Sequence, residues 1–196
     1  MRLKIIQVGD PALRDTARSL EQQEIRSPEI QNLIEWMRET MHDAPGVGLA
    51  APQVGMPLRL AVIEDKPEYL RDLSSEVLTE RERRPVPFHV IINPVLELLD
   101  EPKTTFYEGC LSLAGFTALV PRSRGVRVNA LNHHGEPVVI EASGWYARIL
   151  QHEIDHLNRT LYIDRMASRS FMSMENYLRY WRNRTIAETK QWIGWS

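Results

Sequence analysis

Apolar residues recur at helical spacing after Ser27. Ser27 is a residue type that caps helices, and Pro28 suits the first helical turn. Five apolar residues then fall at positions 0, 3, 4, 7 and 11 of one face: Ile30, Leu33, Ile34, Met37 and Met41. This period predicts an amphipathic helix with one buried face. We expect it to end at residues 45–46, a Pro-Gly pair that breaks helices.

A second helical stripe follows Ser143, which is another candidate cap. The residues that share this broad face are Trp145, Ile149, Leu150, His152, His156 and Leu157. Because most of them are apolar, the pattern predicts a buried face. Both histidines should therefore point toward the interior of the protein.

Shorter apolar runs between turn signals predict β-strands. The expected strands are 3–7, 58–63, 88–92, 95–99, 104–107, 126–132 and 137–142. The last two alternate apolar and polar residues on either side of a turn, which predicts a hairpin. His133 and His134 lie at its tip, and we interpret them as part of a solvated turn because neighbouring side chains diverge there.

Two segments are rich in charge. Residues 64–87 alternate in sign, which predicts a surface insertion with a helical turn near 69–73 rather than a patch for nucleic acid. From Asp164 onward, six basic residues stand against three acidic ones. We expect a helix at about 174–183 in this basic tail.

The composition places the chain among soluble globular proteins of one domain. Its 196 residues are 43% hydrophobic and 26% charged, and the formal net charge is −2. This balance gives no general attraction to nucleic acid or to anionic membranes. No apolar run is long enough for a membrane span, residues 1–4 do not open a signal peptide, and the single cysteine excludes an intrachain disulfide. We expect a cytoplasmic protein with neither nucleic-acid specificity nor a membrane partner.

Residues 152–156 read His-Glu-x-x-His within the second helix. Side chains four residues apart lie above one another on a helix, so His152 and His156 can bind one metal ion. Glu153 lies beside them and can carry a proton. Histidines at this spacing also occur on helix surfaces, but the buried stripe favours a metal site.

A catalytic metal site of this kind needs a third protein ligand. No histidine follows His156, which excludes the long metzincin signature. Glu175 and Glu188 lie downstream, in the polar and basic tail. Cys110 is the stronger candidate, because a thiolate is an excellent ligand for a borderline metal. Considered alone, Cys110 would more often be a buried, inert cysteine.

The glycine-rich segment 46–55 lacks the Walker and dinucleotide-binding patterns, and by itself it predicts a tight connection before a strand. Three segments in order closely resemble the three motifs of peptide deformylases: Gly46-Val47-Gly48-Leu49-Ala50-Ala51-Pro52-Gln53, Glu108-Gly109-Cys110-Leu111-Ser112 and Gln151-His152-Glu153-Ile154-Asp155-His156-Leu157. The resemblance covers about residues 1–166, including the start at 9–14. Segments 114–122 and 168–171 are most similar to the subgroup that includes mitochondrial enzymes.

This resemblance implies an α+β fold. Antiparallel β-sheets would pack around a central helix that carries the His-Glu-x-x-His motif, with an N-terminal and a C-terminal helix beside them. It further implies a single catalytic domain at 1–170 and a helical tail of the same domain at 171–196.

The resemblance also implies an activity, a metal-dependent hydrolysis of the formyl group of N-formylmethionine on newly synthesised polypeptides, with release of formate. The implied metal ligands are Cys110, His152 and His156. The implied catalytic groups are Glu153 as proton carrier, with the side-chain amide of Gln53 and the N–H of Leu111 as donors to the formyl oxygen. The implied substrate-binding residues are Val47, Gly48, Leu49, Gly109, Arg148 and Ile149.

By resemblance, the cofactor is one divalent metal ion, natively Fe²⁺, with Zn²⁺, Ni²⁺ or Co²⁺ able to occupy the site. The ligand types do not choose among these metals. The implied partners are nascent formylated polypeptides and, transiently, the ribosome near its exit tunnel. The aromatic and basic tail around 177–182 is a candidate surface for that contact.

Two departures from the family pattern stand out. Arg159 occupies a position that is usually Gly, and we expect Asn158 to take the left-handed conformation that ends the helix. The charged segment 64–87 is longer than expected. We also expect Glu108 to support the metal site by pairing with Arg122. Two alternatives remain: a zinc endopeptidase that uses a downstream glutamate, and a non-enzymatic module whose metal has a fourth protein ligand.

Overall fold

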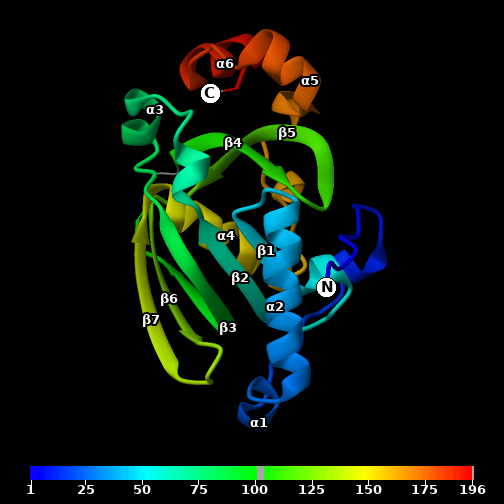
Figure 1. Ribbon diagram of the computed structural model, residues 1–196. Coiled ribbons are helices and arrows are strands. Elements are labelled where there is room, and N and C mark those ends of the chain that lie inside the picture. The colour runs from blue at the N-terminus through cyan, green and yellow to red at the C-terminus, as the bar shows by residue number, and fades with distance from the viewer. Residues whose placement is uncertain (101–103, 196) are drawn as a thin grey trace.

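A computed structural model describes residues 1–100 and 104–195 as a mixed α+β fold (Figure 1). The helices are α1 (Gln22–Ile25), α2 (Pro28–Asp43), α3 (Ser75–Glu80), α4 (Gly144–Leu157), α5 (Met174–Asn176) and α6 (Ile186–Ile193). The strands are β1 (Gly48–Ala50), β2 (Leu60–Asp65), β3 (Val86–Leu98), β4 (Thr104–Cys110), β5 (Leu113–Arg122), β6 (Gly125–Leu131), β7 (Pro137–Ser143) and β8 (Met172–Ser173). Among the described helices, none is both long and apolar enough to cross a membrane.

The strands form two antiparallel sheets. The larger sheet has the order β1-β2-β3-β6-β7, and β6 and β7 make the predicted hairpin. The smaller sheet has the order β4-β5-β8 and lies above the larger one in Figure 1, next to the C-terminal tail. The antiparallel α+β class expected from the sequence is confirmed.

Helices α2 and α4 cover opposite faces of the larger sheet. Side chains alternate along a strand, so Ala61 and Ile63 of β2 pack in the cluster that contains α4, whereas Leu60 and Val62 pack in the cluster that contains α2. Helix α4 is therefore enclosed by protein, and the placement of the His-Glu-x-x-His motif on a central buried helix is confirmed.

The amphipathic pattern predicted α2 closely. The hydroxyl of Ser27 accepts a hydrogen bond from the N–H of Ile30 at 3.3 Å, and the predicted apolar face is buried. The two strands expected at 88–92 and 95–99 are instead one strand, β3, with an irregularity between Ile92 and Val95. Asn93 adopts φ 51° at this point, and its side-chain amide exchanges two hydrogen bonds of 2.9 Å with the backbone of Leu20.

Several expected elements differ in the structure. Residues 3–7, expected as a strand, form none. The N–H of Ile6 donates to the carbonyl of Gln53 at 2.9 Å, and the N–H of Val8 donates to that of Ser112 at 2.7 Å. The glycine-rich connection contains the short strand β1, because its backbone pairs with β2. Strand β5 was missed, although residues 116–120 supply an almost continuous apolar run.

The end of the motif helix also differs from the prediction. Asn158 has φ −107°, and Arg159 itself takes the left-handed conformation with φ 65°. The Arg159 side chain donates to the carbonyl of Arg14 at 2.8 Å, and Arg14 donates back to the carbonyl of Arg159 at 3.0 Å. These hydrogen bonds tie the non-glycine residue to the N-terminal segment.

The charged insertion and the tail contain more helix than expected. Residues 64–87 include a 3₁₀ turn at Pro67–Leu70 and helix α3. In the tail, α5 continues into a π-helix at Tyr177–Trp181, and α6 follows. The sequence analysis did not predict helix α6, although Thr185 and Glu188 form a capping box, which is a sequence signal for the start of a helix.

Candidate metal centre

Three potential metal ligands meet at the centre of the molecule. His152 and His156 project from one face of α4, and Cys110 stands at the end of β4. Their ligand atoms all lie within 4.8 Å of one another, and Cys110 Sγ is 3.3 Å from His156 Nε2. A thiol and two imidazoles form a donor set suited to a borderline divalent metal, so the residues present fit such an ion.

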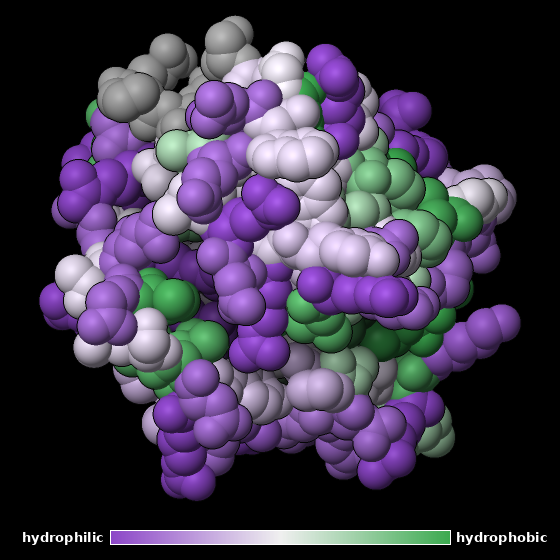
Figure 2. Space-filling model, turned by 90° about the horizontal axis from the view of Figure 1, so that it is seen from above, coloured by the Kyte–Doolittle hydropathy of each residue, from purple (hydrophilic) through white to green (hydrophobic). Residues whose placement is uncertain are grey.

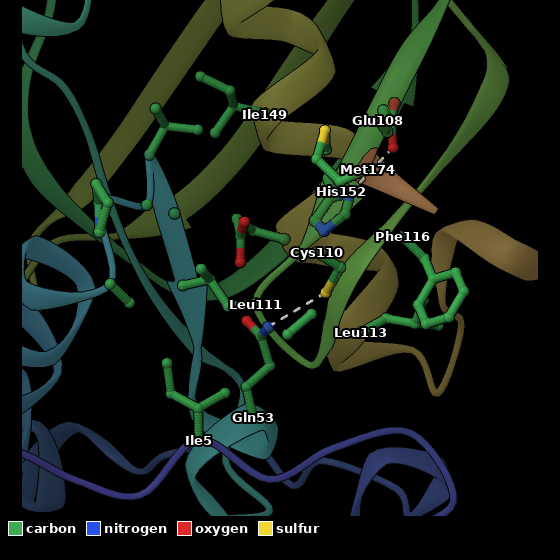
Figure 3. A pocket seen from close by; sticks show the side chains of 18 of the residues that line it. Ile5, Gln53, Glu108, Cys110, Leu111, Leu113, Phe116, Ile149, His152 and Met174 are labelled. Atoms are coloured by element: carbon green, nitrogen blue, oxygen red, sulfur yellow. Dashed lines mark hydrogen bonds and ion pairs between the residues drawn. The ribbon is translucent and has the colours of Figure 1, made fainter. Parts of the chain in front are cut away.

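The cysteine is held by the glycine-rich segment (Figure 3). Gln53 donates from Nε2 to Cys110 Sγ at 3.5 Å and to Ser112 Oγ at 3.2 Å. The other end of the same amide, Oε1, accepts from the N–H of Ala50 at 2.9 Å. Its orientation is thereby fixed, with N–H groups turned toward the cluster.

A buried carboxylate orients one histidine. Glu108 Oε2 lies 3.0 Å from His152 Nδ1, which leaves Nε2 as the available ligand atom of that ring. Arg122 donates to both oxygens of Glu108 at 3.0 Å, and Arg148 donates to Oε1 at 2.6 Å. Burial alone would raise the pKa of Glu108, but Arg122 and His152 hold it well below its usual range. The expected Glu108–Arg122 pair is confirmed.

Glu153 stands next to the cluster with a free oxygen. Its side chain is buried, and Oε2 has no hydrogen-bond partner among the described residues. Burial raises the pKa of Glu153 to about 7, so the carboxyl can both accept and return a proton near neutral pH. Gly48 makes room for it, because a Cβ there would lie 2.2 Å from Glu153 Oε1.

A cavity of about 610 Å³ opens over these groups. Of the residues expected to bind substrate, Val47, Gly48, Gly109, Arg148 and Ile149 line it. The two expected oxyanion donors, Gln53 and Leu111, line it as well. The chain thus brings together, around one cavity, segments that are far apart in sequence.

Leu49 is the exception among the expected pocket residues. Its side chain is fully buried in the cluster that contains α2. Because side chains alternate along β1, Gly48 and Ala50 face α4 while Leu49 points to the opposite side of the sheet. The expectation that Leu49 lines the methionine pocket is therefore wrong.

Some cavity residues were missed by the sequence analysis. Gln7 donates from Nε2 to the carbonyl of Leu111 at 2.9 Å and accepts at Oε1 from the N–H of Ala114 at 3.2 Å. Nothing in the pattern around Gln7 marks it, because its role depends on a loop more than 100 residues away. Other unexpected lining residues are Tyr107, Phe116, Trp145 and Met174.

The downstream glutamates do not reach the centre. Within residues 1–100 and 104–195, the only group of three or more potential ligands is Cys110, His152 and His156. Glu188 caps α6 through Thr185, and Glu175 is exposed on α5. Among the residues that the structure describes, no fourth ligand of these types joins the cluster. Both alternative sites considered from the sequence therefore lack support.

A buried helix with two histidines and a glutamate, completed by a cysteine from a strand, supplies the three protein ligands of a single metal centre of the kind that metal-dependent hydrolases use. The family model described as polypeptide deformylase matches residues 2–171. The chain belongs to this family of metalloenzymes.

Curated relatives agree with this assignment. The chain is 46% identical over 172 residues to peptide deformylase 1A, chloroplastic, of Solanum lycopersicum. It is 43% identical over 194 residues to peptide deformylase 3 of Streptomyces avermitilis. It is 42% identical over 177 residues to the mitochondrial peptide deformylase of Homo sapiens. These matches cover 88%, 99% and 90% of this chain. The chain spans 62%, 84% and 71% of the relatives' own lengths.

Solved structures show the same fold. A Met-Ala-Ser-bound peptide deformylase from Acinetobacter baumannii matches with a TM-score of 0.73 and 30% identity, covering 85% of this chain and 99% of that one. The enzyme from Ehrlichia chaffeensis matches with a TM-score of 0.73 and 36% identity, covering 85% and 89% of the two chains.

Proposed function

We propose that this protein removes the formyl group from the N-terminal N-formylmethionine of newly synthesised polypeptides and releases formate. The observation that carries this proposal is the free carboxylate of Glu153 beside the Cys110, His152 and His156 cluster, at the base of a cavity. Membership of the polypeptide deformylase family supports it.

Cys110, His152 and His156 would hold one divalent metal ion. When bound, the ion supplies Lewis acidity, which lowers the pKa of water and polarises the formyl group. We propose Fe²⁺ as the native ion, with Zn²⁺, Ni²⁺ or Co²⁺ able to occupy the site. Glu108 fixes the ring of His152 through Nδ1, so the ligand is presented in one orientation.

Glu153 moves the proton. Its Oε2, which has no hydrogen-bond partner among the described residues, takes a proton from the attacking water, and burial keeps that proton on the carboxyl. The same oxygen then delivers the proton to the amine nitrogen as the carbon–nitrogen bond breaks. One proton is carried from water to the leaving amine, which gives formic acid and a free amino terminus, and the acid then releases its own proton and leaves as formate.

Gln53 and Leu111 stabilise the negative charge that develops on the formyl oxygen. The Gln53 amide is held with its N–H groups toward the cluster, and it is therefore set before substrate arrives. The N–H of Leu111 is the second donor. Fixed donors of this kind each contribute about 100-fold or more to catalysis in acyl transfer.

The walls of the cavity receive the peptide. Gly48 and Gly109 offer backbone groups to the substrate main chain, while Val47, Ile149 and the aliphatic part of Arg148 contact the methionine side chain. The Acinetobacter relative was crystallised with Met-Ala-Ser, a peptide that begins with methionine. Such a peptide is the expected product of this reaction.

The substrate also suggests where the protein works. Formylated chains begin at the ribosome, so we place the reaction in the cytoplasm, with transient contact near the ribosomal exit tunnel. We assign residues 1–170 to one catalytic domain and residues 171–196 to a helical tail of the same domain. The buried cluster that joins Ile193 of the tail to Tyr107 and Leu119 supports placing the tail in the same domain.

Paired substitutions test the proposal. Glu153→Ala should retain bound metal but lose at least 100-fold in formate release from a formyl-Met peptide, because the proton carrier is gone. Cys110→Ala should lose metal affinity. Glu188→Ala is a matched control and should change neither property.

Two results would overturn the proposal. Wild-type-like turnover in Glu153→Ala would remove the assigned proton carrier, and stoichiometric metal of normal affinity in Cys110→Ala would remove the assigned ligand. Loss of metal in Glu188→Ala, with cleavage of internal peptide bonds by the wild type, would instead support an endopeptidase.

A further inference from the structure

The C-terminal tail is attached to the rim of the cavity by backbone pairing. In β8, Met172 and Ser173 pair with Thr117 and Phe116 of β5. The first residues of β5 and the loop before it line the cavity. The rings of Phe116 and Phe171 are stacked, with centroids 5.1 Å apart and an angle of 8° between their planes. The tail therefore continues the wall that β5 begins.

Met174 extends this wall, because its side chain lines the cavity. It is the first residue of α5 and one of the lining residues, and it lies beyond residue 171, where the match to the family model ends. In Figure 3 its side chain lies on the same side of the site as those of Glu108 and Phe116. The tail thus supplies a lining side chain that the matched part of the family does not include.

The tail has firm support beneath this wall. Tyr107 lines the cavity, and its ring centroid lies 4.7 Å from that of Tyr177 in the tail. Tyr107 also belongs to a buried cluster with Ile193 of α6. Because both ends of the tail pack on the smaller sheet, Met174 is held at a defined place rather than on a free end.

Exposure distinguishes the depth of the cavity from its rim. Ile149 and Arg148 are each 4% exposed, whereas Met174 is 37% and Phe116 is 41% exposed. Figure 2, which views the molecule from above, shows hydrophobic patches among hydrophilic residues on that side of the molecule. When a formylmethionine reaches the cluster of Cys110, His152 and His156, the residues that follow it in the peptide must cross the exposed rim.

We propose that Met174 and Phe116 form a specificity wall for the residues that follow the formylmethionine, and that the tail exists in part to hold this wall. The inference rests on the proposed function. Apolar side chains just after the methionine gain contact with the wall, whereas glycine or serine there gains little. Phe171 acts as a positioning residue, because it stacks on Phe116 and does not itself line the cavity.

Steady-state kinetics with three peptides tests this wall: formyl-Met-Leu-Ser, formyl-Met-Ser-Leu and formyl-Met-Gly-Ser. In Met174→Ala, the KM of at least one leucine peptide should rise about threefold to tenfold, while the kcat values and the KM of the glycine peptide stay near wild type. Phe171→Ala should shift the same leucine peptide in the same direction, and Phe171→Tyr, which keeps the stacked ring, should restore it. Leu178→Ala is the control, since Leu178 is exposed in the tail away from the cavity.

The outcomes separate this inference from the proposed function. Unchanged KM values for both leucine peptides in Met174→Ala, or an equal rise for all three peptides, would overturn the wall while leaving deformylation intact. A comparable selective rise in Leu178→Ala would also overturn it. Absence of formate release by the wild-type protein would overturn the proposed function itself, and the wall with it.

Discussion

A single missing side chain makes room for Glu153, the proposed proton carrier. Glu153 can lie beside the metal-ligand cluster because Gly48 has no Cβ, and the space that a Cβ would need is filled by the carboxyl group. The sequence predicted both residues, Glu153 from the helical motif and Gly48 from the glycine-rich segment. It did not predict that they touch, because the contact joins β1 to α4 across about 100 positions of the chain.

Gln7 is the residue whose importance is visible only in the folded protein. Its amide holds Leu111 and Ala114 at once, and so it fixes the loop that carries one proposed oxyanion donor. We predict that Gln7→Ala lowers kcat about tenfold with little change in KM, because donor placement matters most in the transition state.

A matched substitution controls for the loss of a glutamine amide. Gln22 donates to the carbonyl of Gly135 at 2.7 Å, at the hairpin turn between β6 and β7. Gln22→Ala should leave both kcat and KM unchanged. Equal kcat values in Gln7→Ala and the wild type would show that the loop keeps its place without Gln7.

At the scale of elements, the charged insertion is packed against the start of helix α4. The carbonyl of Arg81 accepts from the N–H of Trp145 at 2.8 Å, at the first turn of α4. Gly144 adopts φ +60°, and a Cβ there would lie 2.4 Å from Glu82 Cβ and 2.7 Å from the carbonyl oxygen of Arg81. The insertion that alternating charges predicted as a surface segment therefore caps α4.

Gly144→Ala tests this contact. We predict a loss of about 3–5 kcal/mol in the free energy of unfolding, from left-handed strain and from the clash with the insertion together. Urea denaturation measures it. Gly55→Ala is the control, because Gly55 has φ +78° with no atom within 4 Å of its added Cβ, and it should lose only about 1–2 kcal/mol. Equal losses in the two variants would show that the packing of the insertion contributes nothing.

At the scale of the whole molecule, a charge network with buried members Glu108, Arg122 and Arg148 joins the smaller sheet to α4. Glu108 of β4 pairs with Arg122 of β5, with Arg148 and with His152. Arg122 also pairs with Asp155, which is in turn bound by Arg165 at 2.7 and 2.8 Å. The network links the smaller sheet to α4 and fixes His152 relative to the strand that carries Cys110.

Removing the charge of Glu108 should therefore affect both stability and metal binding. We predict that Glu108→Gln destabilises the metal-free protein by about 3–5 kcal/mol, because buried arginines lose their partner. It should also weaken metal affinity about tenfold to 100-fold through His152. Denaturant unfolding and metal titration measure the two effects.

An exposed pair provides the comparison. Glu97 binds Arg127 at 3.1 Å on the surface, so Glu97→Gln should change stability by less than about 1 kcal/mol and leave metal affinity unchanged. Normal metal affinity in Glu108→Gln would show that His152 is oriented without this carboxylate.

The sequence by itself determined the local parts of this protein. Helical periodicity and a serine cap predicted α2, and the i, i+4 spacing placed His152 and His156 on one buried face, because these features depend on neighbours within a few turns. Tertiary structure alone decided which face of β1 meets the cavity, so that Gly48 reaches Glu153 while Leu49 enters the core. It also decided that Gln7, Met174 and the 64–87 insertion belong to the surroundings of the site. Their roles depend on contacts between distant segments, and no local pattern of apolar and polar residues encodes such contacts.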